Sequence, residues 1–427
     1  MKPSHPRRFP QSLATMSAWL LAALMLAPAR AEYSPYYIGV VETLEHNTNI
    51  YRVGDQQVLP PEVSKSDSLI ASALIGGIDQ SFGRQHATGG LTLRDTRYRS
   101  NSQLNNQGYT LNLGLDWSSA NRVSGRLSAS ADRNLAQFNS QTVNGVIETR
   151  KNIQTINQVD ASFALGTVTK FTAEAAVGAR QRTFSAPAYA RLGYDQTNAS
   201  VGLKYRPSSL VSFGASLRTS QTRYPRFTDL GNGSFDSDTL KRHDLDLTAV
   251  WQYSGLNQFS ARISPTRTTD ARLVDQNFSG LTGAANWTWI PTGRLSLHSA
   301  LTRDSGVSAQ SVNLGFFGPG VVDYSRVTNG IRTRADFELT SKIALNASLS
   351  YAQRDLVNTL LAGGNNLRQQ NATDRTSVFG LGAKWVPTRS VQLSCNLSKE
   401  QRSSSNPVVS VPLRADMFGC AGQLILQ

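Results

Sequence analysis

The sequence predicts an all-β fold, a transmembrane antiparallel β-barrel of about 18 strands that follows a cleaved signal peptide. Three observations support this prediction: an export signal at the N-terminus, about 400 residues in which apolar side chains recur at every second position, and connections that alternate between short and long. Strands that cross a membrane must close into a barrel, because lipid offers no partner to the backbone groups of an open edge.

The first 31 residues have the pattern of a secretory signal peptide. The apolar stretch is too short to span a bilayer as a helix. We therefore expect a signal peptide at 1–31 and an outer-membrane barrel at 32–427. Lys2, Arg7 and Arg8 form the charged start of the signal peptide. Residues 19–27 form its apolar core, and Ala29-Arg30-Ala31 is an A-x-A cleavage signal.

Alternation with a period of two residues predicts strands that are apolar on one face and polar on the other. Between residues 122 and 133, Val123 and Leu127 share one face, whereas Arg126 and Ser128 share the other. The same pattern recurs in residues 170–182 and 343–354 and in ten further segments, and eighteen candidate strands can be counted in all.

Short turns at one end of a barrel and long loops at the other are typical of outer-membrane barrels. Eight short and nine long connections join eighteen strands and place both termini on the short-turn, periplasmic side. A count of sixteen stays open, because the strands before Arg52 and after Val321 have weak boundaries. The short connections are expected near residues 83, 119–121, 166–167, 207–209, 254–255, 291–293, 341–342 and 387–389. The clearest long ones are expected at 55–66, 101–107, 139–151, 225–239, 306–324, 356–373 and 401–413.

Composition fits a barrel with a polar lumen better than a soluble domain. Only 17% of residues are charged, which is low for a soluble surface. The 43 basic and 29 acidic residues give a formal charge of +14, and four of the basic residues lie in the signal peptide. In an exported protein this excess favours an anionic glycan or lipid headgroup as partner, and we expect no nucleic acid.

Aromatic residues on the apolar face gather near the short turns. This position predicts a girdle at the periplasmic membrane interface. Its members are Trp117, Tyr205, Trp251, Tyr253, Trp287, Trp289 and Trp385.

The polar faces of the strands carry many cations, which we expect to line the lumen. Guanidinium forks match carboxylates, so a ladder of them would guide an anionic chain through a wet tube. The alternative is a salt-bridge network that ties the wall together, since nine acidic residues share these faces. The cations are Arg94, Arg126, Lys170, Arg180, Arg182, Lys204, Arg218, Arg262, Arg294, Arg332, Arg334, Arg354 and Lys384.

No enzymatic activity is expected. Ser296, His298 and Asp304 share one polar face, but the set spreads over more than about 20 Å of strand and cannot form a triad. The sequence has no nucleophile-elbow, zinc-protease or phosphate-loop motif.

No cofactor or metal is expected either. Four oxygen-bearing side chains, Asp229, Asn232, Asp236 and Asp238, fall in one predicted loop, but their spacing does not match a calcium-binding EF-hand loop.

The two cysteines, Cys395 and Cys420, fall on the apolar face of the last two strands. If they are cross-strand neighbours, Leu397 faces Phe418 and every pair stays on one face. A disulfide that closes the final hairpin is then possible in the oxidising exported compartment, and two free thiols facing lipid are the alternative.

Several short motifs resemble one family. Residues 45–53, Glu-His-Asn-Thr-Asn-Ile-Tyr-Arg-Val, are similar to a segment near the mature start of the EpsL-type outer-membrane proteins of exosortase and PEP-CTERM-associated exopolysaccharide clusters. His46-Asn47 stands where that family has paired aspartates. Further similar motifs follow in the same order at Ser66-Asp67, Arg84-Gln85, Tyr98-Arg99, Leu115-Asp116-Trp117 and residues 135–138.

The resemblance implies a role in exopolysaccharide biosynthesis or export across the outer membrane of a Gram-negative bacterium. We expect a channel whose basic lumen guides an anionic polysaccharide, with outer-membrane lipid around it and periplasmic export components as partners. The alternatives are a general or anion-selective porin for small solutes, or a non-conducting barrel that binds surface glycan.

Overall fold

The computed structural model describes residues 34–119, 122–138, 142–143, 146–230, 233–271, 277–305, 325–362, 365–407 and 410–426. The predicted signal peptide lies outside the described residues. Residues 36–427 form one compact unit, which is the barrel. No helix in the described ranges is long and apolar enough to cross a membrane.

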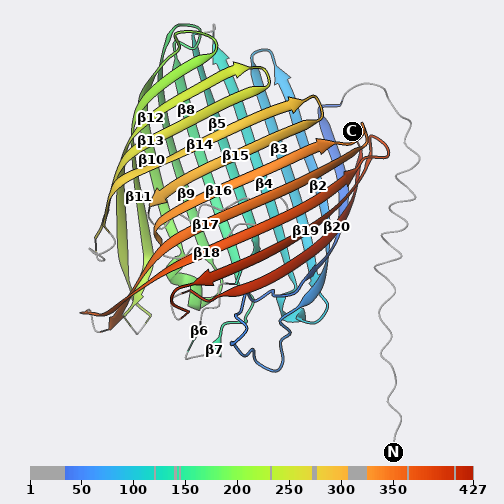
Figure 1. Cartoon of the computed structure of the whole chain (residues 1–427), viewed down its shortest axis with the longest axis vertical. Helices are drawn as coiled ribbons and strands as arrows, with labels where there is room; N and C mark the ends of the chain where they lie inside the picture. The colour runs from blue at the N-terminus through green and yellow to red at the C-terminus, as the bar shows by residue number, and fades with distance from the viewer. Residues whose placement is uncertain are drawn as a thin grey trace, which may run out of the picture. The chain divides into compact units, whose positions relative to one another are not determined.

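Eighteen antiparallel strands form one sheet that closes on itself (Figure 1). Each strand pairs with its sequence neighbours, and β1 closes the barrel by pairing with β20 from Ile38↔Leu426 to Asn47↔Met417. The predicted fold class and the count of eighteen are therefore confirmed. The strands are β1 (Tyr36–Asn47), β2 (Asp67–Phe82), β3 (Gln85–Tyr98), β4 (Asn106–Ser119), β5 (Val123–Leu135), β8 (Ile153–Leu165), β9 (Phe171–Phe184), β10 (Tyr194–Tyr205), β11 (Val211–Asp229), β12 (Phe235–Ser254), β13 (Asn257–Asp270), β14 (Phe278–Thr292), β15 (Leu295–Ser305), β16 (Ser325–Glu338), β17 (Ile343–Ala362), β18 (Asn365–Trp385), β19 (Val391–Ser404) and β20 (Leu413–Leu426).

The long connections carry small elements of their own. A two-stranded hairpin, β6 (Thr142–Val143) with β7 (Val146–Ile147), lies between β5 and β8. Short 3₁₀ helices follow β3 and β9, namely η2 (Ser102–Leu104) and η3 (Pro187–Leu192).

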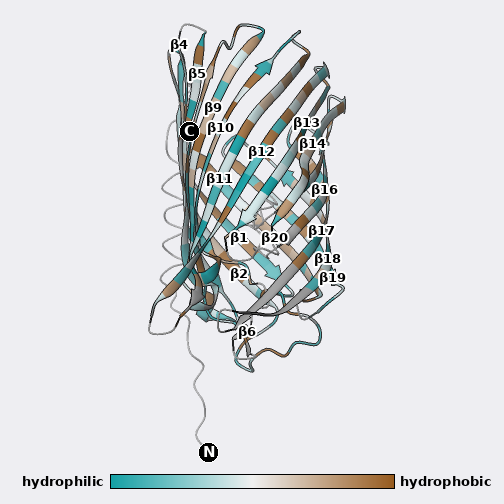
Figure 2. Cartoon of the chain, turned by 90° about the vertical axis from the view of Figure 1, so that its left-hand side faces the viewer, coloured by the Kyte–Doolittle hydropathy of each residue, from teal (hydrophilic) through white to brown (hydrophobic). Residues whose placement is uncertain are grey.

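The period of two places apolar side chains outside and polar ones inside. Figure 2 shows the two kinds alternating along single strands. On β11, Phe213 and Leu217 point outward and are 51% and 62% exposed, whereas Arg218 lies on the lumen face. Residues that would form the core of a soluble protein therefore cover the outside, as a lipid-facing surface requires. The chain is a transmembrane barrel of the outer-membrane type.

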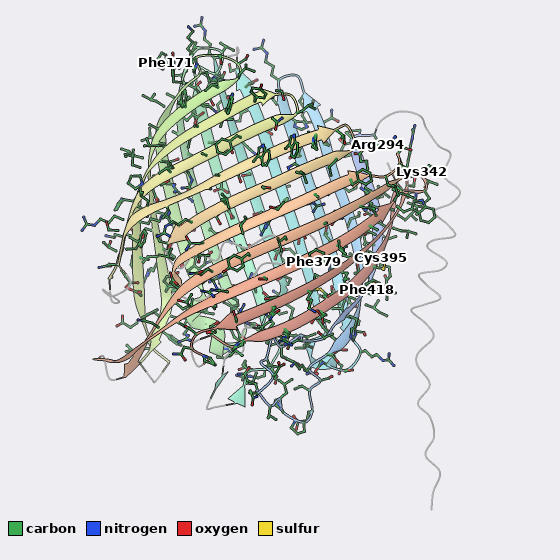
Figure 3. All side chains as sticks on the ribbon, in the orientation of Figure 1. Phe171, Arg294, Lys342, Phe379, Cys395 and Phe418 are labelled. Atoms are coloured by element: carbon green, nitrogen blue, oxygen red, sulfur yellow. A yellow bond between two sulfur atoms is a disulfide. The ribbon has the colours of Figure 1, made fainter. Side chains whose placement is uncertain are left out.

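The predicted short turns are at one end of the barrel. Two of them need a left-handed backbone, which glycine adopts without strain: Gly83 has φ +62° and Gly166 has φ +85°. Figure 3 shows Phe171, Arg294 and Lys342 at this end.

Two predicted long loops are instead strand. Residues 225–239 continue β11 and β12 through an irregular register near Tyr224, and residues 356–373 continue β17 and β18. Neither segment keeps a strict alternation of apolar and polar side chains, because beyond the membrane both faces of a hairpin meet water. Residues 306–324 lie outside the described residues.

Inward and outward positions should respond oppositely to a charge. We expect Leu397→Lys, on the outer face, to lower the free energy of unfolding by about 2–4 kcal/mol if it lies near the bilayer midplane. Asn396→Lys, one residue earlier on the lumen face, should change it little. Urea titration of the barrel in lipid vesicles measures both, and equal losses would contradict the assignment of faces.

Candidate functional site: the lumen and its mouth

The strand register places eleven of the thirteen predicted lumen cations on inward-facing positions. The other two, Lys170 and Arg294, lie in short turns. The inward face also holds charged residues that the sequence analysis missed, and most of them are acidic. On the described strands, inward carboxylates therefore outnumber inward cations. The missed residues are Glu45, Asp67, Asp79, Asp238, Arg242, Asp270, Asp374, Glu400 and Arg402.

Ion pairs neutralise six of the predicted cations. All but the Arg334–Asp336 pair, which lies within β16, tie neighbouring strands together in a network, which was the alternative interpretation of these residues. The shortest N···O distances are 3.2 Å for Arg126–Asp116, 4.0 Å for Lys204–Glu174, 2.9 Å for Arg218–Asp246, 3.1 Å for Arg262–Asp246, 2.6 Å for Arg334–Asp336 and 2.5 Å for Arg354–Asp374.

The densest part of this network centres on Arg242 of β12. Its guanidinium lies 2.9 Å from Asp244 and 2.7 Å from Asp304 on β15, so one side chain joins four consecutive strands. Thr266 and Thr282, both buried, bond each other beneath it at 2.7 Å. Arg242 and Asp244 are two residues apart and share one face of β12. The period of two in the sequence could therefore have identified Arg242 as a lumen residue.

Arg182 points inward but is not open to the lumen. It is 2% exposed and donates a 2.7 Å bond to the carbonyl of Leu192 in η3. The rings of Phe184 and Tyr194 stack against its guanidinium at 5.2 and 4.5 Å. Arg182 therefore holds η3 in place, and we correct its predicted guiding role.

The other four predicted lumen cations that lie on strands make no ion pair among the described residues. They are Arg94, Arg180, Arg332 and Lys384. Arg94 still lies near the Glu45 carboxylate. The remaining three are positive charges that a solute in the lumen can meet.

One sector of the wall lacks charge through its middle. The inward faces of β17 to β20 and of β1 and β2 carry small or uncharged side chains between their ends. Examples are Ser348, Gly382, Asn396, Ala421 and Ala73. The lumen therefore has one charged sector and one neutral sector.

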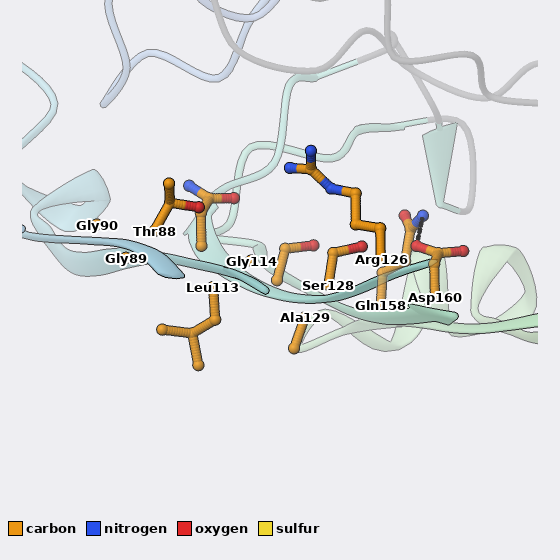
Figure 4. A pocket seen from close by; sticks show the side chains of 12 residues that line it. Thr88, Gly89, Gly90, Leu113, Gly114, Arg126, Ser128, Ala129, Gln158 and Asp160 are labelled. Atoms are coloured by element: carbon orange, nitrogen blue, oxygen red, sulfur yellow. Dashed lines mark hydrogen bonds between the residues drawn. The ribbon is translucent and has the colours of Figure 1, made fainter. Parts of the chain in front are cut away.

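A hollow of about 430 Å³ lies in the charged sector, over β3, β4, β5 and β8. Figure 4 shows Thr88, Arg126 and Ser128 on the lumen side of the sheet and Leu113 on the other. Gly114 makes room there, because a Cβ at this position would lie 3.3 Å from the Arg126 guanidinium.

A cap of long connections covers part of the mouth, over β1 to β8. Tyr51, Val53, Leu104, Phe138 and Ile147 form a small buried core between three loops. The Tyr51 ring packs against Phe138 at 4.7 Å between centroids, and its hydroxyl bonds Asn101 at 3.2 Å. Burial raises the pKa of Tyr51 to about 12.

Polar contacts anchor the loops to the lumen wall. The Arg52 guanidinium pairs with Glu400 of β19, and Ser410 donates to the buried Asp374 carboxylate of β18 at 2.7 Å. The Asn49 amide bonds the Arg414 carbonyl at 2.9 Å. The motif at 45–53 thus contributes to the cap. The alternation pattern of a single strand could not predict this role.

The predicted girdle residues lie on the outer face near the short turns. Trp287 stacks on Trp289 at 5.5 Å, and Trp251 meets Tyr253 edge-on at 5.5 Å. Tyr205 stacks on Phe171 at 4.8 Å. The other members, Trp117 and Trp385, lie opposite Gly125 and Ile343 on the same face.

The two cysteines lie opposite each other and form a disulfide on the outer face. Leu397 faces Phe418, which is the predicted register. Cys395 and Phe418 can be followed in Figure 3.

The side chains considered for catalysis contact other groups. His298 Nδ1 lies 3.2 Å from the Thr288 hydroxyl, and Asp304 pairs with Arg242. Among the described residues, no three His, Cys, Asp or Glu side chains gather closely enough to hold a metal. Asn232 of the predicted acidic loop lies outside the described residues, and Asp236 and Asp238 belong to β12.

No family model matches this chain, and no curated protein matches it. Among solved structures it is similar to Pseudomonas aeruginosa OccK2 (OpdF) in complex with glucuronate, with 10% identity, a TM-score of 0.46, and coverage of 92% of this chain and 96% of that one. The outer membrane protein opdK from the same organism has 11% identity, a TM-score of 0.45, and coverage of 92% and 99%. The FrpB iron transporter from Neisseria meningitidis has 10% identity, a TM-score of 0.45, and coverage of 87% and 63%. These likenesses carry no argument about what this chain conducts or binds.

Removal of Arg242 should destabilise the barrel strongly. Arg242→Met leaves Asp304 without its cation and the buried Asp244 with Arg218 alone, at 3.3 Å, and breaking a buried pair costs about 3–5 kcal/mol. Arg334→Met breaks an exposed pair and should cost about 1 kcal/mol or less. Unfolding by urea in lipid vesicles compares the two, and equal losses would contradict a structural role for the Arg242 network.

The cap should open when its central ring is removed. We expect Tyr51→Ala to expose residues 55–63 to added protease, because the ring fills the buried loop core. Tyr51→Phe keeps the ring and loses only the bond to Asn101, so it should resist cleavage nearly as the unaltered chain does. Limited proteolysis in vesicles measures this, and a resistant Tyr51→Ala protein would contradict the packing account.

Proposed function

We propose that the chain is an outer-membrane channel for small hydrophilic solutes with a preference for anions. The observation that carries this proposal is the division of the lumen wall. Arg180, Arg332 and Lys384 make no ion pair among the described residues, while the sector formed by β17 to β20, β1 and β2 is small and uncharged through its middle.

This division supports passage rather than tight binding. An anion beside a single guanidinium gains a charge-assisted contact. The neutral sector offers it no second cation through its middle, since Lys384 lies at the short-turn end of β18, so the contact stays weak enough for release. Because inward carboxylates outnumber inward cations over the described wall, a preference for anions depends on where the unpaired cations lie.

Charge removal at these positions should change ion selectivity. We expect the unaltered protein in a planar bilayer to give a reversal potential of anion-selective sign under a potassium chloride gradient. Arg180→Gln, Arg332→Gln and Lys384→Gln together should shift that potential toward cation selectivity. The matched control removes three outward cations, with Arg223→Gln, Lys241→Gln and Arg267→Gln, and should leave it unchanged.

Two results would overturn the proposal. An absence of conductance would contradict the channel and favour the non-conducting glycan-binding barrel. Conductance with a reversal potential that the lumen substitutions do not move would contradict the role of the three cations.

The finer role, passage of an anionic exopolysaccharide with periplasmic export components, rests on the motif resemblance and stays a prediction. The same bilayer tests it. Block of the conductance by the exopolysaccharide, at concentrations where a neutral dextran has no effect, would support it. If the exopolysaccharide and the neutral dextran affect the conductance equally, the export role is contradicted and the small-solute channel is retained.

A further inference from the structure

Nine basic side chains form a belt on the outside of the barrel. Each lies on an outward-facing strand position, between the apolar residues of its strand and a long connection. In the described strands, no outward-facing lysine or arginine lies nearer to the short turns. The members of this basic belt are Arg97, Arg133, Arg223, Lys241, Arg267, Arg303, Arg375, Lys399 and Arg414.

Most side chains of the basic belt form no ion pair with neighbouring strands. Arg97 pairs with Asp95 at 2.7 Å, and Arg303 donates to the Asn329 side chain at 2.9 Å. The other seven, all exposed, make no ion pair within the described part of the chain. Since the described strands place only four outward carboxylates at this level, the belt keeps an excess of positive charge.

The belt is densest where three consecutive strands each contribute one cation. Lys241 on β12 lies diagonally next to both Arg223 on β11 and Arg267 on β13. Diagonal neighbours in an antiparallel sheet have Cα atoms about 7–8 Å apart, so long side chains can converge on one ligand. His243 lies directly opposite Arg267 and could add a further donor. Asp195, opposite Arg223, contributes one carboxylate and is engaged by Gln181 at 2.9 Å.

This cluster lies just beyond the apolar surface. On β13, Ile263 points outward and is 57% exposed, and Arg267 follows four residues later, about 13 Å along an extended strand. An outward cation at this level meets lipid headgroups rather than hydrocarbon.

We propose that Arg223, Lys241 and Arg267 form a binding site for phosphate-bearing lipid headgroups of the leaflet at the long-loop end. Guanidinium and ammonium groups are the side chains that recognise phosphate, and basic clusters at membrane level attract anionic headgroups. The site is separate from the lumen and does not depend on what the channel conducts.

The test uses the full mature chain, purified and reconstituted in lipid nanodiscs. We expect the unaltered protein to retain lipopolysaccharide added from micelles, and to retain much less of the same lipid after enzymatic removal of its phosphates. Arg223→Gln, Lys241→Gln and Arg267→Gln together should weaken retention on the order of 100-fold, since each basic residue contributes about a factor of five at an anionic surface. The matched control with Arg180→Gln, Arg332→Gln and Lys384→Gln removes the same charge from the lumen and should bind as the unaltered protein does.

Each arm has an outcome that overturns the site. Equal retention of phosphorylated and dephosphorylated lipid would show that phosphate is not recognised. Equal weakening by the lumen control would show that overall charge, and not this cluster, attracts the lipid. If the outer triple variant fails to migrate as a folded barrel, the single variant Lys241→Gln, expected to lose about fivefold, replaces it.

Discussion

Closure of the sheet is the constraint on which the rest of the structure depends. Each strand that crosses lipid must pair its backbone groups on both sides, and the pairing of β1 with β20 leaves no open edge. Closure also separates two environments, since one face of every strand must suit hydrocarbon and the other must suit water. Girdle aromatics, lumen charges and the outer basic belt all follow from that alternation.

Charge inside the barrel performs two different tasks. Many lumen cations pair with carboxylates on other strands, and Arg242 by itself connects β12 with β15. Such pairs fix the shape of the wall, and they neutralise charges that would otherwise be open to a solute. Of the cations left open to the lumen, Arg180 lies on β9 and Arg332 on β16, whereas Lys384 lies at the short-turn end of β18, in the sector whose middle is small and neutral. At the mouth, buried loop residues and the Arg52–Glu400 pair hold a cap against the wall.

The sequence was sufficient to predict the fold, because the period of two and the alternation of connection lengths are local patterns. It also placed Cys395 and Cys420 on one face of the last two strands from parity alone, and the register of the closed sheet brings them opposite each other. It could not separate paired from unpaired lumen cations, since the partners of Arg218 lie on a neighbouring strand whose register is fixed only by the closed sheet. It mistook residues 356–373 for a loop, because a hairpin beyond the membrane needs no apolar face. The cap escaped prediction for a related reason: Tyr51, Leu104 and Phe138 come from three separate connections.

The most direct test of the account is the aqueous accessibility of adjacent positions on one strand. Ser128→Cys places a thiol on the lumen face beside the hollow, and Ala129→Cys places one on the outer face. In lipid vesicles, a membrane-impermeant thiol reagent should modify the cysteine at position 128 quickly and the one at 129 hardly at all. Equal or reversed rates would contradict a water-filled lumen within a lipid-facing barrel.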